Sequence, residues 1–471
     1  MPHETLKVYN KFAHQNTRKK CSHTTTLLYN DKHIIGRLFR YFSAYFVTFA
    51  VPTAESLFLL VLAILAMESA DSIRSLYRHF LSGITTKSLN AFYYACSYAK
   101  VDYSAFMNVT ARLSLKLAPA DLKSQPLFLC IDDTMVSKSG KKFEDVSKLF
   151  DHAAHNGSNY LNGHCFVSLM LCVPVWNRNR ISYLAVPLGY RMWQKKESKL
   201  ELASAMVRQV MPEFHAQKNV IILCDSWYVK QNLVSIVDEY ENLDLIGNAR
   251  ADSVLYDLPP APTGKKGRPA KHGRRLSINS DFTLSGEKAG DYYTGCRRVL
   301  TNIFGAREVM AYVTCTGKEN GTRRLFFSTI FPAQLQIFCA WQEKAPLNQT
   351  GSGWMPYIPL FLYSFRWNIE VSCYEQKSFW SLCAYMIRSR RGIEMLVNLI
   401  NISYCAMKLL PYMEEALSQY RNSSVQEFRF ALSEQIRRQI FYVNLVQHVE
   451  THIKSMAVIK ALRRLCLGET A

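Results

Sequence analysis

Two kinds of apolar pattern follow one another along the chain. From about residue 38 to residue 117 the apolar side chains recur at helical spacing, with breaks near Pro52 and Thr85 and cap-forming residues at Asp71 and Ser88. From residue 126 onward, short apolar runs at 127–131, 165–175 and 181–188 predict three successive strands. Helical spacing over 198–214 and 229–240 then alternates with an apolar run at 220–224, which predicts a buried fourth strand, and with a fifth strand at 243–247. The pattern predicts an all-helical module followed by an α/β domain with the order βββαβαβ.

This order is typical of a ribonuclease-H-like domain, which needs one more helix to be complete. In such a mixed sheet the first and fourth strands are neighbours, so their carboxyl ends lie at one edge of a crevice. Asp132 follows the first of these apolar runs and Asp225 follows the fourth. Between residues 251 and 350 the pattern becomes irregular and predicts a mostly β insertion. Helical periodicity then returns at Pro356 and continues to about residue 467.

Composition narrows the class of protein. A chain of 471 residues with 49% hydrophobic and 20% charged residues can bury a sizeable core, which excludes a wholly disordered protein. Its 57 Lys and Arg against 37 Asp and Glu give a formal charge of +20, and such an excess on the surface favours a polyanionic partner. Residues 1–40 form a basic arm, with eight Lys or Arg and two Asp or Glu.

Several other classes of protein do not fit the sequence. The most apolar segment, residues 57–67, is too short for a membrane span of about 20 residues and predicts a core helix. No secretory leader pattern is found in the polar and basic first 40 residues, so we expect no export. The 13 cysteines are scattered without a Cys-x-x-Cys pair, which favours reduced thiols. The spacing of His152, His155, His164 and Cys165 matches no common zinc template, so structural histidines are expected there.

One helix in the region 356–410 carries a candidate site. Tyr363, Arg366, Glu370 and Lys377 are offset by 0, 3, 7 and 14 residues, which places them within an arc of about 60° on a continuous helix. An exposed ion pair between Arg366 and Glu370 is the simplest explanation of that pair alone. Beside Asp132 and Asp225, however, Glu370 supplies a third carboxylate to the same crevice. Hard oxygen ligands of this kind suit two Mg²⁺ ions in phosphodiester chemistry.

These segments resemble those of insertion-sequence DDE transposases, in the branch whose third carboxylate lies in Tyr-x2-Arg-x3-Glu-x6-Lys. Tyr363-Ser-Phe-Arg366-Trp-Asn-Ile-Glu370 with Lys377 matches that spacing completely. Cys130-Ile131-Asp132-Asp133-Thr134 is similar to the Asp-x-Thr segment of the family. Leu223-Cys224-Asp225-Ser226-Trp227-Tyr228 is similar to its Asp-x-x-Tyr segment. The likeness covers about residues 120–410.

The resemblance implies a metal-dependent DNA transposase that cuts element ends and joins the freed 3′-hydroxyl to target DNA. Asp132, Asp225 and Glu370 would be the catalytic residues and the ligands of two Mg²⁺ ions, for which Mn²⁺ can substitute. Asp133, adjacent to Asp132, is the alternative ligand, although strand alternation points it to the opposite face. Tyr363, Arg366 and Lys377 would bind phosphates of the DNA ends. The implied partners are double-stranded DNA, as terminal inverted repeats and as target, and a second copy of the chain. The implied location is the bacterial cytoplasm at the nucleoid, with no membrane partner.

Four further residues are candidates for DNA contact. The run from Gly264 to Arg275 in the expected insertion could place Arg268 in a narrow minor groove, while Lys265 and Lys266 neutralise phosphates; a solvated basic loop is the alternative. Trp227 could stack on a displaced base, although a buried core tryptophan is the more common role.

The expected organisation has five parts. Residues 1–120 would form the basic arm and helical DNA-binding module, and residues 121–250 the first part of the catalytic core. Residues 251–350 would be the insertion, residues 351–410 the end of the core, and residues 411–471 a helical C-terminal region. Two other functions stay open: a catalytically silent DNA-binding protein derived from a transposase, and a nuclease of the same fold acting on RNA–DNA hybrids.

Overall fold

The computed structural model describes residues 33–100, 102–140, 142–151, 159–177, 180–217, 219–261, 268–317, 321–331, 334, 354–453 and 455–468. Most of the basic arm and the candidate DNA contacts Lys265 and Lys266 lie outside these residues. The chain divides into two compact units. Unit 1 comprises Met1–Thr110, Val136–His164 and Tyr374–Ala471, and unit 2 comprises Ala111–Met135 and Cys165–Cys373.

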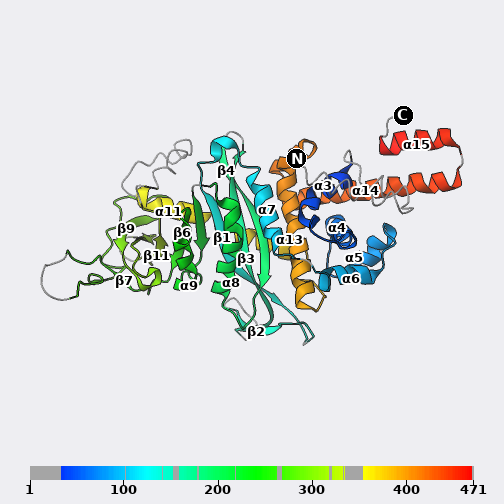
Figure 1. Cartoon of the computed structure of the whole chain (residues 1–471). Helices are drawn as coiled ribbons and strands as arrows, with labels where there is room; N and C mark the ends of the chain where they lie inside the picture. The colour runs from blue at the N-terminus through cyan, green and yellow to red at the C-terminus, as the bar shows by residue number, and fades with distance from the viewer. Residues whose placement is uncertain are drawn as a thin grey trace. The chain divides into compact units, whose positions relative to one another are not determined.

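A mixed sheet forms the centre of unit 2 (Figure 1). Its strands are paired in the order β3-β1-β5-β6-β11-β10-β9, and β4 pairs with β3. The strands are β1 (Leu127–Ser137), β3 (Tyr160–Asn177), β4 (Arg180–Met192), β5 (Val220–Cys224), β6 (Leu243–Ala249), β9 (Tyr293–Val299), β10 (Val309–Cys315) and β11 (Arg324–Ser328). Short β7 (Leu255–Tyr256) and β8 (Arg275–Leu276) form a separate two-stranded sheet.

The predicted pairing of the first and fourth core strands is confirmed. β1 and β5 are parallel, with Leu127 opposite Val220 and Ile131 opposite Cys224, and β5 is in turn parallel to β6. All five residues of β5 are buried, as are the first five of β1. Strands buried on both faces read as continuous apolar runs, which is why the sequence pattern located them.

The segment expected to be an insertion contributes directly to this sheet. β9, β10 and β11 extend it by antiparallel pairing, and β11 joins it to β6 through Leu325 opposite Ala249. Residues 251–350 are therefore not separate from the core, because three of their strands share its hydrogen-bonded ladder.

Two helical segments of unit 2 connect strands of the sheet, one between β4 and β5 and one between β5 and β6. Helix α8 (Lys199–Val210) begins at a capping box formed by Ser198 and Glu201 and continues into the 3-10 helix η3 (Met211–Phe214). The second predicted helix is shorter than expected, consisting of α9 (Gln231–Val234) and η4 (Ser235–Asp238).

The expected continuous helix around Glu370 is interrupted, and that prediction was wrong. Helix α11 (Trp354–Ser364) ends before Arg366, and α12 (Trp367–Phe379) begins after it. Across the junction the backbone bonds span three residues, from Arg366 N to Tyr363 O and from Ile369 N to Arg366 O. A tighter turn rotates each residue by about 120° instead of 100°, so the arc calculated for a continuous α-helix does not apply across this junction.

Long-range packing holds this junction in place. The Phe365 ring stacks on Phe128 of β1, with centroids 4.9 Å apart, and it also meets Tyr183. The Cys130 thiol donates to the Phe365 carbonyl over 3.7 Å. Burial of this aromatic residue against β1 fixes where α12 begins.

Unit 1 is mainly helical, as the N-terminal and C-terminal patterns predict. Its helices include α3 (Ile34–Phe46), α4 (Val51–Ala66), α5 (Ile73–His79), α6 (Leu89–Ser97), α13 (Arg390–Met413), α14 (Val425–His452) and α15 (Met456–Leu467), with the 3-10 helices η1 (Leu81–Gly83) and η7 (Glu415–Asn422). Helix α7 (Ala105–Leu115) and the 3-10 helix η2 (Ala120–Leu122) connect toward β1. The short strand β2 (Ser147–Phe150), which the pattern did not predict, pairs with the beginning of β3.

Buried apolar helices account for the most hydrophobic segments of unit 1. Helix α4 contains the segment 57–67 expected to be a core helix, and twelve of its residues, Ala54 and Ser56 to Ala66, are buried. Among the described residues, α13 is long and apolar enough to cross a membrane, but 94% of its most apolar window is buried inside the protein. The Ser72 side chain caps α5 by accepting from Ser75 N, one position after the expected Asp71.

Candidate active site

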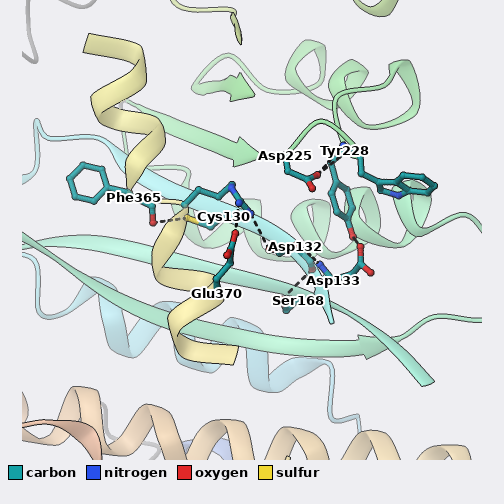
Figure 2. A network of polar contacts seen from close by, with 10 residues as sticks. Cys130, Asp132, Asp133, Ser168, Asp225, Tyr228, Phe365 and Glu370 are labelled. Atoms are coloured by element: carbon teal, nitrogen blue, oxygen red, sulfur yellow. Dashed lines mark hydrogen bonds and ion pairs between the residues drawn. The ribbon is translucent and has the colours of Figure 1, made fainter. Parts of the chain in front are cut away.

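Asp132 and Asp225 stand side by side where two parallel strands stop pairing. The register ends with Ile131 opposite Cys224, so the next residue on each strand is one of the two aspartates. The sequence pattern indicated that Asp132 lies at the end of its strand. β1 instead continues to Ser137, so Asp132 lies within the strand. Figure 2 shows both carboxylates at this edge of the sheet.

Backbone groups orient the two carboxylates. Asp132 Oδ1 accepts a hydrogen bond from the Asp133 amide at 2.8 Å. Asp225 Oδ1 accepts from the amides of Trp227 at 3.0 Å and Tyr228 at 3.3 Å, which closes the turn after β5. The Ser168 hydroxyl of β3 donates to the Asp132 carbonyl over 3.2 Å. The aspartates are thus held by main-chain donors and by the neighbouring strand.

Arg366 links the aspartates to the third carboxylate. Its Nη1 lies 3.0 Å from Asp132 Oδ2, and its Nη2 donates to Glu370 Oε1 one turn along the chain. The arginine side chain is 13% exposed, against 22% for Asp132 and 35% for Glu370. Arg366 therefore joins Glu370 to Asp132 through ion pairs with both, and Figure 2 labels the two carboxylates.

The pKa values of Asp132 and Asp225 are raised, mainly because both carboxyl groups are partly buried. Burial raises the pKa of Asp132 to about 7, Arg366 counteracts this increase, and the charge of Asp225 adds to it. Burial also raises the pKa of Asp225, against the effects of Arg366 and of the two amide donors. Carboxylates that are desolvated beside one another gain most from a nearby cation.

A second polar cluster lies on the opposite side of β1. Asp133 Oδ2 is 2.8 Å from Lys199 Nζ and accepts from the Cys165 thiol at 3.2 Å. Asp133 Oδ1 accepts from the Tyr228 hydroxyl at 3.2 Å. Asp133 thus bonds to side chains from β3, from α8 and from the turn after β5. These structural contacts support Asp132, and not Asp133, as the residue that faces the site.

The sequence pattern did not find Lys199 or Cys165. Both meet Asp133 only through the tertiary fold, from the first turn of α8 and from β3. The available signals were the two-residue alternation of β1, which separates Asp132 from Asp133, and the three-residue spacing of Tyr228 from Asp225.

Tyr363 lies at the end of α11, and Lys377 lies in α12. Tyr363 is half-buried at the end of α11, its ring 5.1 Å from that of Phe326, and the Arg366 guanidinium carbon lies 5.8 Å from its centroid. Burial raises the pKa of the Tyr363 hydroxyl, which stays protonated and able to donate. Lys377 lies in the last turn of α12, seven residues after Glu370.

The remaining candidate DNA contacts are exposed where the structure describes them. Trp227 is 49% exposed, so the expectation of a buried tryptophan was wrong, and Lys230 Nζ lies 3.9 Å from the centroid of its ring. Arg268 is exposed on an irregular segment. In unit 1, His164 is buried between the Tyr385 hydroxyl at 2.7 Å and the Glu144 carbonyl at 2.8 Å, as a structural histidine.

The donor set fits a hard divalent ion in kind. Asp132 and Asp225 offer carboxylate oxygens on adjacent strands, each with its pKa raised by burial. Within the described ranges, no three His, Cys, Asp or Glu side chains are grouped closely enough to hold an ion. The ion pairs of Arg366 account for part of this, because they hold Glu370 on the far side of the guanidinium group from Asp132.

Comparisons with known proteins place this geometry in a family. No curated protein matches the chain. Among solved structures it is similar to the NurA nuclease from Sulfolobus solfataricus, at 9% identity and a TM-score of 0.22, over 53% of this chain and 84% of that one. The family model described as DDE superfamily endonuclease matches residues 50–292, a range that includes Asp132 and Asp225 and ends before Glu370. Because this match spans more than half of the 471 residues, the chain belongs to the DDE superfamily endonuclease family.

Proposed function

We propose that the protein is the DNA transposase of an insertion sequence, which cuts the ends of its element and joins the 3′-hydroxyl to target DNA. The observation that carries the proposal is the placement of Asp132 and Asp225 after the paired ends of two parallel strands, with Arg366 in ion pairs with Asp132 and Glu370. The spacing of Tyr363, Arg366, Glu370 and Lys377 resembles that of transposases and therefore supports a transposase within the endonuclease family. The strand order β4-β3-β1-β5-β6 supports a ribonuclease-H-like core.

In this proposal the three carboxylates hold two Mg²⁺ ions, or Mn²⁺ in their place. Bound ions of this kind activate the attacking oxygen and stabilise the leaving oxygen of a phosphodiester. Asp132 and Asp225 hold their positions through backbone donors, so little reorganisation is needed at these two ligands. Glu370 becomes available when Arg366 turns from the carboxylates to a DNA phosphate, for which its planar fork is suited.

Basic and aromatic side chains around the carboxylates serve as DNA contacts. Tyr363 offers a protonated hydroxyl to a phosphate of the DNA end, and Lys377 a point charge. Trp227, exposed and covered on one side by Lys230, is placed to stack on a base. The other contacts proposed from the basic segment are Arg268, Lys265 and Lys266.

The proposed partners follow from the reaction. The protein binds double-stranded DNA, both as terminal inverted repeats and as target, and the formal charge of +20 favours such a polyanion. Because two element ends must be joined, it acts as a homodimer on DNA, in the bacterial cytoplasm at the nucleoid.

The alternative function is a catalytically silent DNA-binding protein derived from a transposase. Two observations favour it: Arg366 forms ion pairs with both Asp132 and Glu370, and the family match ends before Glu370. A protein of this kind would bind the element ends and leave them intact.

A strand-transfer assay separates these functions. Purified protein is incubated with Mg²⁺, a supercoiled plasmid and a labelled duplex that carries an element end with a free 3′-hydroxyl. Joining of the label to the plasmid, lost in Glu370→Gln and retained in the surface control Glu239→Gln, supports the transposase. Cleavage without joining would reduce the proposal to a nuclease, and binding without either reaction would support the silent protein.

A further inference from the structure

A groove of unit 1 combines features that the proposed function does not use. It is formed by α6 together with the segment that leads into α13, and its volume is about 720 Å³. Its lining is mainly aromatic and polar: Asn90, Tyr93, Tyr94, Ser97, Tyr98, Met386, Ile387, Arg388 and Ser389. Pockets of about 300–1,000 Å³ are typical of binding sites for small organic ligands.

Small residues bring the two walls of the groove together. A Cβ added at Gly392, in the first turn of α13, would lie 2.7 Å from Ser97 Oγ and 2.3 Å from Ile387 Cδ1. The Ser389 hydroxyl caps α13 by accepting from Gly392 N and lies 3.0 Å from Ser97 Oγ. This close approach fixes the segment 386–389 beside α6, so the groove is built into the fold.

Two tyrosines present their rings to solvent along the groove. Tyr94 lies in α6 and Tyr98 is the C-cap residue of this helix, and their rings are stacked with centroids 6.2 Å apart and an angle of 28°. They are 58% and 71% exposed, which is far more than packing of α6 requires. Exposed, nearly parallel aromatic rings are platforms on which unpaired bases stack, because every base has a π face.

The charge of the groove is complementary to a nucleic acid strand. Arg388 is exposed on its rim, and no described carboxylate forms an ion pair with it. Arg390 differs, since its Nε lies 3.7 Å from Asp145 and 3.6 Å from Glu394. The basic run 388–391 therefore supplies one available cation at the groove, with Asn90 and Ser97 as polar neighbours. A single cation beside several aromatic rings suits an unpaired strand better than a duplex, which is held mainly through many phosphate contacts.

We propose that this groove binds an unpaired DNA strand, with bases stacked on Tyr94 and Tyr98 and a phosphate on Arg388. The choice of DNA as the polymer rests on the proposed function, whereas the preference for an unpaired strand rests on the groove. Strands become unpaired next to an element end when it is cut, so the groove would hold DNA that the duplex-binding surfaces release.

The test measures binding of the full-length protein to a fluorescent single-stranded oligonucleotide and to the matching duplex. Tyr94→Ala combined with Tyr98→Ala should weaken single-strand binding by about 5- to 150-fold for each base that loses its stacking partner. Duplex affinity should change by less than about threefold. Tyr98→Phe keeps the ring and should keep the affinity, and Phe430→Ala, which removes an exposed ring of α14, should have no effect. An oligonucleotide with 5-iodouracil should crosslink to Tyr94 or Tyr98.

The possible outcomes separate the inference from the proposed function. Unchanged single-strand affinity in the double alanine variant, while the wild type still cuts element ends, would overturn the inference and leave the function standing. An equal loss of duplex and single-strand binding would identify a duplex site and also overturn it. Failure of the wild type to bind either DNA would contradict the proposed function and the assignment of this groove to DNA together.

Discussion

Replacement of Arg366 by methionine tests whether this arginine serves as the cation of the site in the absence of metal. Arg366→Met keeps most of the side-chain volume but leaves Asp132 beside Asp225 without a counterion. Removing one partner of a buried ion pair costs about 3–5 kcal/mol. Glu370, whose side chain is 35% exposed, adds no more than a surface pair, about 0–1 kcal/mol. Since the Asp132 side chain retains 22% exposure, we expect a loss near the lower end, about 3 kcal/mol.

The assay is thermal or urea-induced unfolding at pH 8, first in EDTA and then with increasing Mn²⁺. The matched control is Arg208→Met, which removes a bidentate but exposed pair with Glu239 and should cost about 0–1 kcal/mol. Because the guanidinium no longer competes for the carboxylates, Mn²⁺ should raise the melting temperature more in Arg366→Met than in the wild type. Adding Asp132→Asn should recover part of the lost stability and abolish the additional Mn²⁺ effect.

Two results would refute this reasoning. The first is an Arg366→Met variant that is no less stable than Arg208→Met, since the arginine would then neutralise nothing of consequence. The second is an unchanged response to Mn²⁺, which would mean that arginine and metal do not share the carboxylates.

Three further predictions concern the supports of the fold. Burial lowers the pKa of His164, so the unfolded chain binds its proton more readily and stability should fall as the pH drops below about 6.5; urea unfolding between pH 5 and 7 should show a flatter profile in His164→Gln. Arg429 is 3% exposed and donates to carbonyls at the ends of α4 and α12, and its guanidinium carbon lies 4.1 Å from the Trp380 ring centroid. Arg429→Met should therefore lower the free energy of unfolding by about 3–5 kcal/mol, whereas Arg438→Met, on the exposed face of α14, should change it little. Equal losses in the two variants would contradict this role of Arg429. Tyr228→Phe removes the hydrogen bond to Asp133, so it should lower the free energy of unfolding by about 1–2 kcal/mol and slow DNA nicking. Nicking at the wild-type rate would argue against a positioning role for Tyr228.

The strands that carry the aspartates could be predicted because burial on both faces leaves a simple pattern. Residues 127–131 and 220–224 are continuous apolar runs, residues 243–247 are apolar except at Asp244, and the observed strands begin at the same residues. The continuation of β1 to Ser137 was missed, since it includes Asp132 and Asp133 and no longer reads as apolar. Strand propensity in that part depends on pairing with β3, which a local pattern does not contain.

Features of the site that depend on distant contacts could not be predicted. The break between α11 and α12 is fixed by Phe365 against Phe128, residues more than 200 positions apart, while the local sequence favours an uninterrupted helix. The bridge from Arg366 to Asp132 and the ion pair between Asp133 and Lys199 arise in the same way. Sequence spacing selected the carboxylates as candidates, and tertiary packing determines which side chains neutralise them.

The most direct test of the central claim is metal-dependent nicking of labelled DNA that carries the flanking ends of the gene. Wild-type protein is compared with Asp132→Asn, Asp225→Asn and Glu370→Gln in Mg²⁺ or Mn²⁺, and DNA binding is measured in parallel. The proposed three-carboxylate site predicts nicking at the ends that is lost in all three variants while binding persists. Tight binding by the wild type without metal-dependent nicking would contradict it.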